Sequence, residues 1–475
     1  MKWLLLGLGC ILCTRIGIAQ ERTITYNVSQ FTFISTRQEL PFWLVSNRHG
    51  LLPNRSGNLW TLRLSSDFVP KRHIQFAYGL SGAVILSPGH NDLFINECYA
   101  SAQWRNIRLD IGMIHPEEVY NGLSSTNGNI MYSGNTRPFP GFNFRSDFIS
   151  LPSFLRFLSF KGNWAEYLMQ DDRYVHHTRL HNKSFHLKIT LSPRLEWIIG
   201  QDHWAQWAGT SPLLGRQPAS FRDYVRIFFA RSGSTGASAS DSLNALGNHL
   251  GRQHLQLNYR GERYTLSLYH DIPFEDGSGT DFRSFPDGTY CLYYGAHDKR
   301  QVISNVIYEF YYTKYQSGSR HDRPATPEEQ KHQDPNHPFY GKKVLGGNDD
   351  YFNNGEYKSG WTYYHRTIGS PFLLARPEGS GWGVYNNRLI GHYLALKGLL
   401  FRRIPYKAQC SYTINYGRYV TPLPGSPRQF SFGLETKLPL TKLPFTLETG
   451  LYGDFGQLFK HNLGILIRIS RSGIL

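Results

Sequence analysis

The sequence contains no apolar run long enough to cross a bilayer as a helix. Beyond the first nineteen residues, no stretch approaches about 18 uninterrupted apolar residues. Cysteine is scarce, and only Cys98, Cys291 and Cys410 follow that first segment, too few and too far apart to imply a disulfide framework. Nucleophile-elbow, phosphate-loop and zinc-ligand motifs are also absent. The sequence therefore points away from a helical membrane protein, a disulfide-rich domain and several common enzyme classes.

The first nineteen residues have the pattern of an export signal. Lys2 supplies the positive start, residues 3–13 the apolar stretch, and Gly17-Ile18-Ala19 a small-residue cleavage site before Gln20. We predict that residues 1–19 are a signal peptide and that residues 20–475 form one domain.

The C-terminal part of the chain alternates between apolar and polar residues with a period of two. Leu463, Ile465, Ile467 and Ile469 are separated mainly by small or polar residues, and the segments 430–438 and 445–454 show the same pattern. Successive side chains of a strand point to opposite faces, so each strand has one apolar face. Strands with one apolar and one polar face suit a wall between lipid and water. The sequence also contains 30 Tyr, 30 Phe and 10 Trp, a number of aromatic residues that suits the girdles of an outer-membrane barrel. The alternative is an aromatic-rich soluble β protein.

Counting such segments predicts an all-β fold, a transmembrane antiparallel β-barrel of about 18 strands. The even number places both termini in the periplasm, where turns are short, and places the long insertions outside the cell. The predicted strands are 24–35, 60–68, 76–84, 96–103, 107–113, 142–149, 154–168, 185–191, 195–200, 255–259, 264–269, 290–294, 306–312, 389–397, 406–416, 430–438, 445–454 and 463–470. The predicted outer loops are 36–59, 87–95, 114–139, 170–182, 201–252, 270–289 and 314–387. We expect these loops to fold inward and occlude the lumen, and residues 223–230 to form a short helix.

The net charge of +16 favours anionic partners, such as an acidic polysaccharide or the phosphates of lipopolysaccharide, while an exported chain does not meet nucleic acid. Cationic side chains also recur at positions expected to face the lumen: Arg63, Arg108, Lys188, Lys407, Lys437 and Arg468. They form either a basic interior or ion pairs with inward carboxylates: Glu196, Glu309, Glu435 and Glu448.

The long loops carry distinctive motifs. Trp204-Ala205-Gln206-Trp207, Asn244-Ala245-Leu246-Gly247-Asn248 and Asp350-Tyr351-Phe352-Asn353-Asn354-Gly355 are three of them, with Phe42-Trp43-Leu44 near the start. Together they resemble the Wzi-type capsule assembly proteins in their Bacteroidetes form, over most of the chain after the signal. The resemblance implies an eighteen-stranded outer-membrane barrel with occluding loops, a lectin-like role in holding capsular polysaccharide at the cell surface, and no catalysis or cofactor. A diffusion pore for sugars or oligosaccharides is the alternative function.

One loop segment combines the chemistry of a sugar site. The candidate polysaccharide-binding residues are Tyr351, Asn353, Asn354, Trp361, Tyr363, Tyr364 and Arg366. Aromatic rings stack on the apolar faces of pyranoses, amides bond to sugar hydroxyls, and an arginine fork pairs with the carboxylate of an acidic sugar. The competing interpretation is that these aromatic side chains pack the loop against the rim of the barrel.

A second loop is rich in glycine, serine and carboxylates: Glu275, Asp276, Asp281 and Asp287. The favoured interpretation is that these carboxylates bond to lumen arginines and pin the loop as a plug. Oxygen ligands on a flexible loop also suit Ca²⁺, although the spacing is not that of an EF-hand. A third interpretation is a carboxylate pair for glycoside hydrolysis on a cell-surface enzyme. We expect no resident metal.

Overall fold

The computed structural model describes residues 23–69, 73–233, 245–275, 282, 284–319, 323–332, 343–344, 349–438, 440 and 443–475. The predicted signal peptide, residues 1–19, lies outside these residues. In the described part of the chain, no helix is both long enough and apolar enough to span a membrane.

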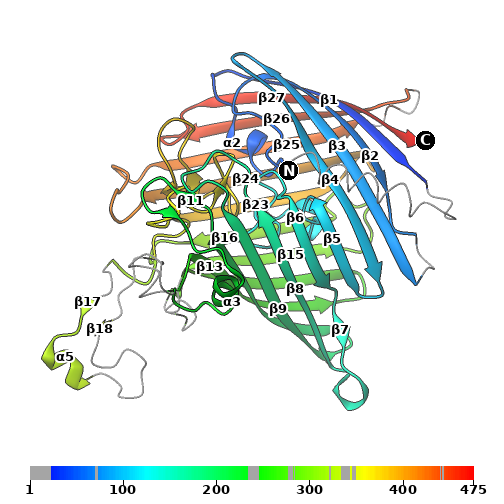
Figure 1. Ribbon diagram of the computed structural model, residues 1–475. Helices are drawn as coiled ribbons and strands as arrows, with labels where there is room; N and C mark the ends of the chain where they lie inside the picture. The colour runs from blue at the N-terminus through cyan, green and yellow to red at the C-terminus, as the bar shows by residue number, and fades with distance from the viewer. Residues whose placement is uncertain are drawn as a thin grey trace.

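Eighteen antiparallel wall strands form a closed barrel, as predicted (Figure 1). Each strand pairs with its neighbours in the wall, and β27 pairs with β1 from Thr25↔Ile474 to Ser35↔Gly464, which closes the ring. The wall strands are β1 (Thr25–Ser35), β2 (Gly57–Ser66), β3 (Ile74–Ser87), β4 (His90–Trp104), β5 (Ile107–Met113), β6 (Gly141–Ser146) continued by β7 (Ile149–Ser150), β8 (Leu158–Leu168), β9 (Arg179–Ser192), β10 (Leu195–Trp207), β13 (Asn248–Arg260), β14 (Tyr264–Phe274), β15 (Gly288–Ala296), β16 (Asn305–Tyr312), β23 (Arg388–Leu400), β24 (Ile404–Gly417), β25 (Arg428–Leu438), β26 (Thr446–Gly456) and β27 (Asn462–Ile474).

The period-two pattern sets the two faces of the wall. On β27, Leu463, Ile465 and Ile467 are 42%, 53% and 40% exposed, whereas Leu466 between them is 5% exposed. An exposed apolar face around a closed barrel is the surface that contacts lipid. The opposite face lines the lumen.

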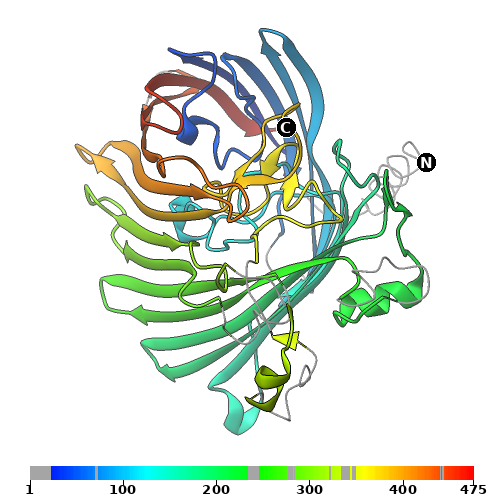
Figure 2. The ribbon, with the colours of Figure 1, turned by 90° about the vertical axis from the view of Figure 1, so that its left-hand side faces the viewer.

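The remaining elements are short and lie in the long connections. They are α2 (Phe42–Val45), η1 (Tyr120–Gly122), η2 (Ser153–Leu155), β11 (Thr210–Ser211), β12 (Gly215–Arg216), α3 (Phe221–Phe228), β17 (Arg323–Pro324), α5 (Pro327–His332), β18 (Lys343–Val344), β19 (Thr362–Tyr363), β20 (Arg366–Thr367), β21 (Leu374–Ala375) and β22 (Val384–Asn386). Figure 2 shows several of these connections inside the ring of strands, whereas α3 lies outside it. The short helix predicted near residue 223 is therefore present.

The helix α3 packs on the outer wall of the barrel instead of contributing to the lumen. Ile227 and Tyr224 of α3 contact the outward-facing Trp207 and Ala205 of β10, in an apolar cluster separate from the lumen core. The indole of Trp164 on β8 donates to the Tyr224 hydroxyl at 2.6 Å. The connection that carries α3 thus covers the extracellular end of the wall from outside.

The prediction of a long outer loop at 87–95 was wrong. Ser87 pairs directly with His90, so only Pro88 and Gly89 connect β3 to β4, and Gly89 adopts a φ of 73°. The strands also extend into the predicted loop 201–252, since β10 continues to Trp207 and β13 begins at Asn248. Near the extracellular rim the outward side chains no longer face lipid alone, so the alternation that marks a strand fades there.

Candidate functional site: the lumen plug and the cavity beneath it

Three connections fold into the barrel and fill its extracellular half. We call residues 40–52, 118–139 and 350–373 together the plug. Its apolar side chains share one buried core with inward residues of the wall, such as Leu59, Ile307 and Leu389. Buried core residues of the plug include Trp43, Leu44, Leu123, Ile130, Met131, Phe139, Phe352, Trp361, Ile368 and Phe372. The expectation that loops occlude the lumen is met by these three segments.

A buried carboxylate of the wall anchors the second plug segment. Glu309 of β16 is fully buried, and its carboxylate accepts hydrogen bonds from the Ser124 hydroxyl at 2.6 Å and the Ser125 amide at 3.1 Å. The hydroxyls of Tyr269 and Tyr311 donate to the same carboxylate, each at 3.0 Å. The Ser125 hydroxyl is the fifth donor to this carboxylate. Because five donors surround one buried group, the position of the loop at residues 124–125 is well defined.

A buried arginine network holds the next turn of the same segment. Arg252 donates to Asp202 at 2.6 Å, to Asp271 at 2.5 Å and to the carbonyl of Gly128 at 2.5 Å. The backbone amide of Ile130, in the plug, also donates to the Asp271 carboxylate, at 3.2 Å. Because the charged groups of this network are buried, paired and hydrogen-bonded, they hold this part of the plug in one geometry.

The second and third plug segments are bonded to each other inside the ring. The indole of Trp361 donates to the Met131 carbonyl at 2.7 Å, and the Ser370 amide donates to the Ile130 carbonyl at 2.9 Å. The Ser133 hydroxyl donates to the Gly369 carbonyl at 2.7 Å. The plug is therefore one packed body and not a set of independent loops.

Most of the predicted sugar-binding aromatics are buried in this body. Tyr351, Trp361 and Tyr363 are exposed by 1%, 0% and 2%, so their ring faces contact protein. Tyr364 is 37% exposed, at the tip of the hairpin formed by β19 and β20. Burial favours the packing interpretation for the first three, and sugar contact stays a prediction centred on Tyr364.

The predicted polar members also have protein partners. Asn353 accepts from the Val384 amide at 2.8 Å and donates to the Val384 carbonyl at 3.0 Å. Asn354 accepts from two backbone amides at 2.9 Å, which shapes its own turn. Arg366 donates to the Leu52 carbonyl at 2.6 Å, and burial lowers its pKa to about 10. These three side chains hold the loop in place in this conformation.

The acidic loop contacts the plug through Glu275 and Asp287. Glu275 accepts from the Phe352 amide, and Asp287 accepts from the Gln316 amide at 2.6 Å and the Tyr351 hydroxyl at 2.8 Å. Burial raises the pKa of Asp287 to about 6. Backbone amides and a tyrosine are therefore among the partners of this loop, and the expected bonds to lumen arginines stay a prediction. Asp276 and Asp281 lie outside the described residues.

Beside Tyr364, the outer surface of the plug region carries residues that the sequence reasoning missed. The guanidinium of Arg137 lies 4.5 Å from the centre of the Tyr364 ring and bonds to Asp92 at 3.0 Å. Trp382, 37% exposed, stacks on His365 with ring centres 6.2 Å apart. We call Arg137, Tyr364, His365 and Trp382 the outer cluster. Arg137 lies in a different connection from the other three members, so no local motif marks the cluster.

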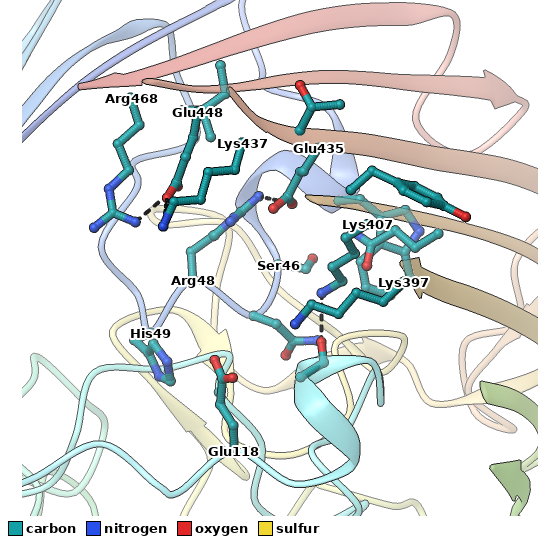
Figure 3. A pocket seen from close by; sticks show the side chains of 18 of the residues that line it. Ser46, Arg48, His49, Glu118, Lys397, Lys407, Glu435, Lys437, Glu448 and Arg468 are labelled. Atoms are coloured by element: carbon teal, nitrogen blue, oxygen red, sulfur yellow. Dashed lines mark hydrogen bonds and ion pairs between the residues drawn. The ribbon is translucent and has the colours of Figure 1, made fainter. Parts of the chain in front are cut away.

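Beneath the plug lies a cavity of about 380 Å³ (Figure 3). Plug residues such as Arg48, His49 and Glu118 line one side, and strands β23 to β27 line the other. The nearby connection 401–403 is a short turn, which places this cavity on the periplasmic side of the plug. The charged lining residues are Arg48, Lys397, Lys407, Lys437, Arg468, Glu118, Glu435 and Glu448.

Most of the predicted lumen cations have carboxylate partners, in agreement with the ion-pair interpretation. Arg468 lies 3.2 Å from Glu448, and Lys188 lies 3.5 Å from Glu196. Arg108 pairs with Asp110 at 2.6 Å. Lys407 differs, because its ammonium donates to the Gly122 carbonyl at 2.8 Å and forms no ion pair within 4.0 Å in the described chain.

A metal centre is not apparent in the part of the chain that the structure describes. No group of three or more His, Cys, Asp or Glu side chains there has a geometry that would hold a metal ion. The free thiols are Cys98, Cys291 and Cys410, of which Cys291 is buried.

Comparisons with known proteins agree with this architecture. No known family and no curated protein matches in sequence. In structure, the chain is similar to Escherichia coli Wzi, described as an outer membrane protein involved in group 1 capsule assembly and a carbohydrate-binding β-barrel. The TM-score is 0.56 at 13% identity, over 94% of this chain and 83% of that one. It is also similar to Pseudomonas aeruginosa OpdO (OccK3), with a TM-score of 0.50 at 10% identity, over 97% and 98% of the two chains.

These identities show a shared fold and not a shared family. The closed barrel, its apolar outer belt and its likeness to an outer membrane protein make this chain an outer-membrane β-barrel of the Gram-negative type.

Proposed function

We propose that this barrel binds an exported polysaccharide, of the capsular kind, at the cell surface and helps to retain it there without catalysis. The observation that carries the proposal is the packed plug: a barrel of this size would otherwise enclose a water-filled channel, and here the channel is filled by a buried core. A filled lumen argues for a surface-binding role over the diffusion pore. The likeness to a carbohydrate-binding barrel is consistent with this choice.

The outer cluster supplies suitable chemistry for such a ligand. Tyr364 and Trp382 each keep a partly exposed aromatic surface, which fits the apolar face of a pyranose. Arg137 adds a cation beside Tyr364, suited to the carboxylate of an acidic sugar. Because the plug fixes the hairpin that carries Tyr364, the cluster is held in place before the ligand arrives.

The proposal is tested by calorimetric titration of the detergent-folded full chain with polysaccharide from its own organism, at low and high salt. We expect saturable binding that weakens about tenfold when Tyr364 and Trp382 are both replaced by Ala, because stacking surface is lost. Phe401→Ala is the matched control, since Phe401 is an aromatic side chain 85% exposed in a short periplasmic turn. Absence of binding by the correctly folded wild type at either salt would refute the proposal.

Salt dependence separates the two sources of attraction. If the polysaccharide is acidic, affinity should fall steeply with ionic strength, because salt screens exposed charges over about 10 Å at 0.1 M. Affinity that is independent of salt would assign the binding to aromatic stacking instead.

A further inference from the structure

The cavity beneath the plug contains two lysines with an unusual arrangement. Lys397 of β23 and Lys407 of β24 are direct cross-strand partners, so their side chains project from the same face into the cavity. Figure 3 shows the two side chains lying together on one side, with Glu118 and His49 on the facing plug. Like charges placed directly opposite each other on neighbouring strands are unfavourable. Such a pair is expected where a bound anion offsets the repulsion.

Two carboxylates of the cavity, Glu435 and Glu118, compensate the charge of this pair in part. Lys397 donates to the Asn121 carbonyl at 2.9 Å, and Lys407 donates to the Gly122 carbonyl at 2.8 Å. Glu435 faces Lys407 across the strands, but its carboxylate binds Arg48 at 2.6 Å. Each ammonium has three donors, so both lysines retain capacity for an incoming acceptor.

The rest of the lining resembles that of a sugar site more than that of a simple ion site. The volume of about 380 Å³ lies within the usual range for small-molecule pockets. Neutral hydrogen-bonding side chains line the cavity beside the lysines, among them Asn47, Gln409 and Thr436, whereas the lining aromatics Trp43 and Tyr393 are each only 1% exposed. Amides and hydroxyls of this kind bond to sugar hydroxyls.

We propose that this cavity binds an acidic sugar unit of a glycan that reaches the barrel from the periplasm, with Lys397 and Lys407 holding its carboxylate. The inference rests on the proposed function for the class of ligand, but it concerns a separate site on the opposite side of the plug. The barrel then contacts acidic glycan at both ends, with the outer cluster at the surface and this lysine pair below.

The test uses the full detergent-folded chain and trigalacturonic acid as the probe, with maltotriose as the neutral counterpart. We expect trigalacturonate to bind and maltotriose not to bind. Replacing both lysines, in Lys397→Gln/Lys407→Gln, should weaken trigalacturonate binding at least tenfold. Lys188→Gln is the control, because Lys188 points into the lumen outside the cavity and pairs with Glu196. Equal affinity of the double variant and the wild type would overturn the proposal.

A second measurement needs no variant. Lysine acetylation of the wild type, read by mass spectrometry, should be slowed by trigalacturonate at Lys397 and Lys407 but not at Lys188. Unchanged acetylation at the pair would also overturn the proposal. Protection by inorganic phosphate equal to that by trigalacturonate would reduce the site to a simple anion site and refute the sugar assignment.

The two proposals fail separately. Loss of polysaccharide binding in the Tyr364/Trp382 variant, with trigalacturonate binding unaffected by the lysine changes, would support the surface function and refute the cavity. Lysine-dependent trigalacturonate binding without any binding of native polysaccharide would do the reverse.

Discussion

Glu309 shows how a single buried carboxylate positions a whole loop. Its replacement by Ala would leave the hydroxyls of Ser124, Tyr269 and Tyr311 without their shared acceptor in a buried site. We expect a loss of about 3 kcal/mol in the free energy of unfolding, measured by urea titration of the detergent-folded barrel. Hydrogen exchange in residues 120–139 should quicken at the same time.

Glu196→Ala is the comparison for Glu309→Ala. Its side chain is 34% exposed and pairs loosely with Lys188, so we expect a loss of at most about 1 kcal/mol. Similar losses in the two variants would contradict the anchoring role of Glu309.

Two histidine rings lie in contact, and we expect them to make the plug sensitive to acid. The rings of His49 and His115 have centres 4.0 Å apart, and burial, with the charge of Arg48 nearby, lowers the pKa of His49 to about 4. Burial likewise lowers the pKa of His115 well below its usual range. Between pH 6.5 and 4 the unfolded chain therefore binds more protons than the folded chain, so stability falls as pH falls.

The variant His49→Gln tests this dependence. From pH 7 to pH 5 the wild type should lose about 2 kcal/mol more unfolding free energy than the variant, as measured by urea midpoints. Taking the difference cancels the other titrations, including that of Asp287, whose raised pKa acts in the opposite direction. Parallel pH profiles would show that His49 is not responsible.

At the scale of secondary-structure elements, α3 depends on its first turn. Ser220 accepts from the Asp223 amide at 3.2 Å, while Asp223 accepts from the Ser220 amide at 3.0 Å, which forms a capping box. Ser220→Ala should destabilise the helix by about 1 kcal/mol and speed amide exchange in α3 about fivefold. Ser380→Ala, in a distant exposed turn, should leave that exchange unchanged. Unaltered exchange in Ser220→Ala would mean that packing on β10, and not the cap, holds α3.

At the scale of the whole molecule, we predict that the plug prevents the barrel from conducting ions. The strand pairing of the wall is complete without the plug, so the ring is expected to form when residues 121–134 are replaced by a short Gly/Ser linker. In planar bilayers we expect steady conductance from this variant and little from the wild type. Comparable conductance from both would restore the diffusion pore as the function.

The alternation of apolar and polar residues predicted the strands of the wall well, but it predicted the ends of the strands near the rim poorly. Leu463, Ile465 and Ile467 face lipid as their alternation indicates, because lipid contact demands apolar side chains at every second position. The turn at Pro88-Gly89 was missed because the neighbouring stretch of β4, above the apolar belt, is partly polar. Likewise, the sequence around Trp361 does not distinguish a ring that stacks on a sugar from a ring that packs in a core, and the structure shows that this ring is buried.

The sites depended on contacts that no local pattern records. Lys407 was recognised as facing the lumen, but its partner Lys397 became apparent only through the register of β23 and β24. Arg137 joins Tyr364 from a distant part of the chain. A sequence motif reports neighbours along the chain, whereas a binding surface is made of neighbours in space.

The sequence by itself determined the all-β class, the number of wall strands and the face that each strand turns to lipid, since a period of two is a property of adjacent residues. Only the tertiary structure decided which loops enter the lumen and which, like that of α3, cover the outside. The physical reason is that loop placement depends on buried polar bonds between distant residues, such as Ser124 and Glu309, which are separated by 185 positions.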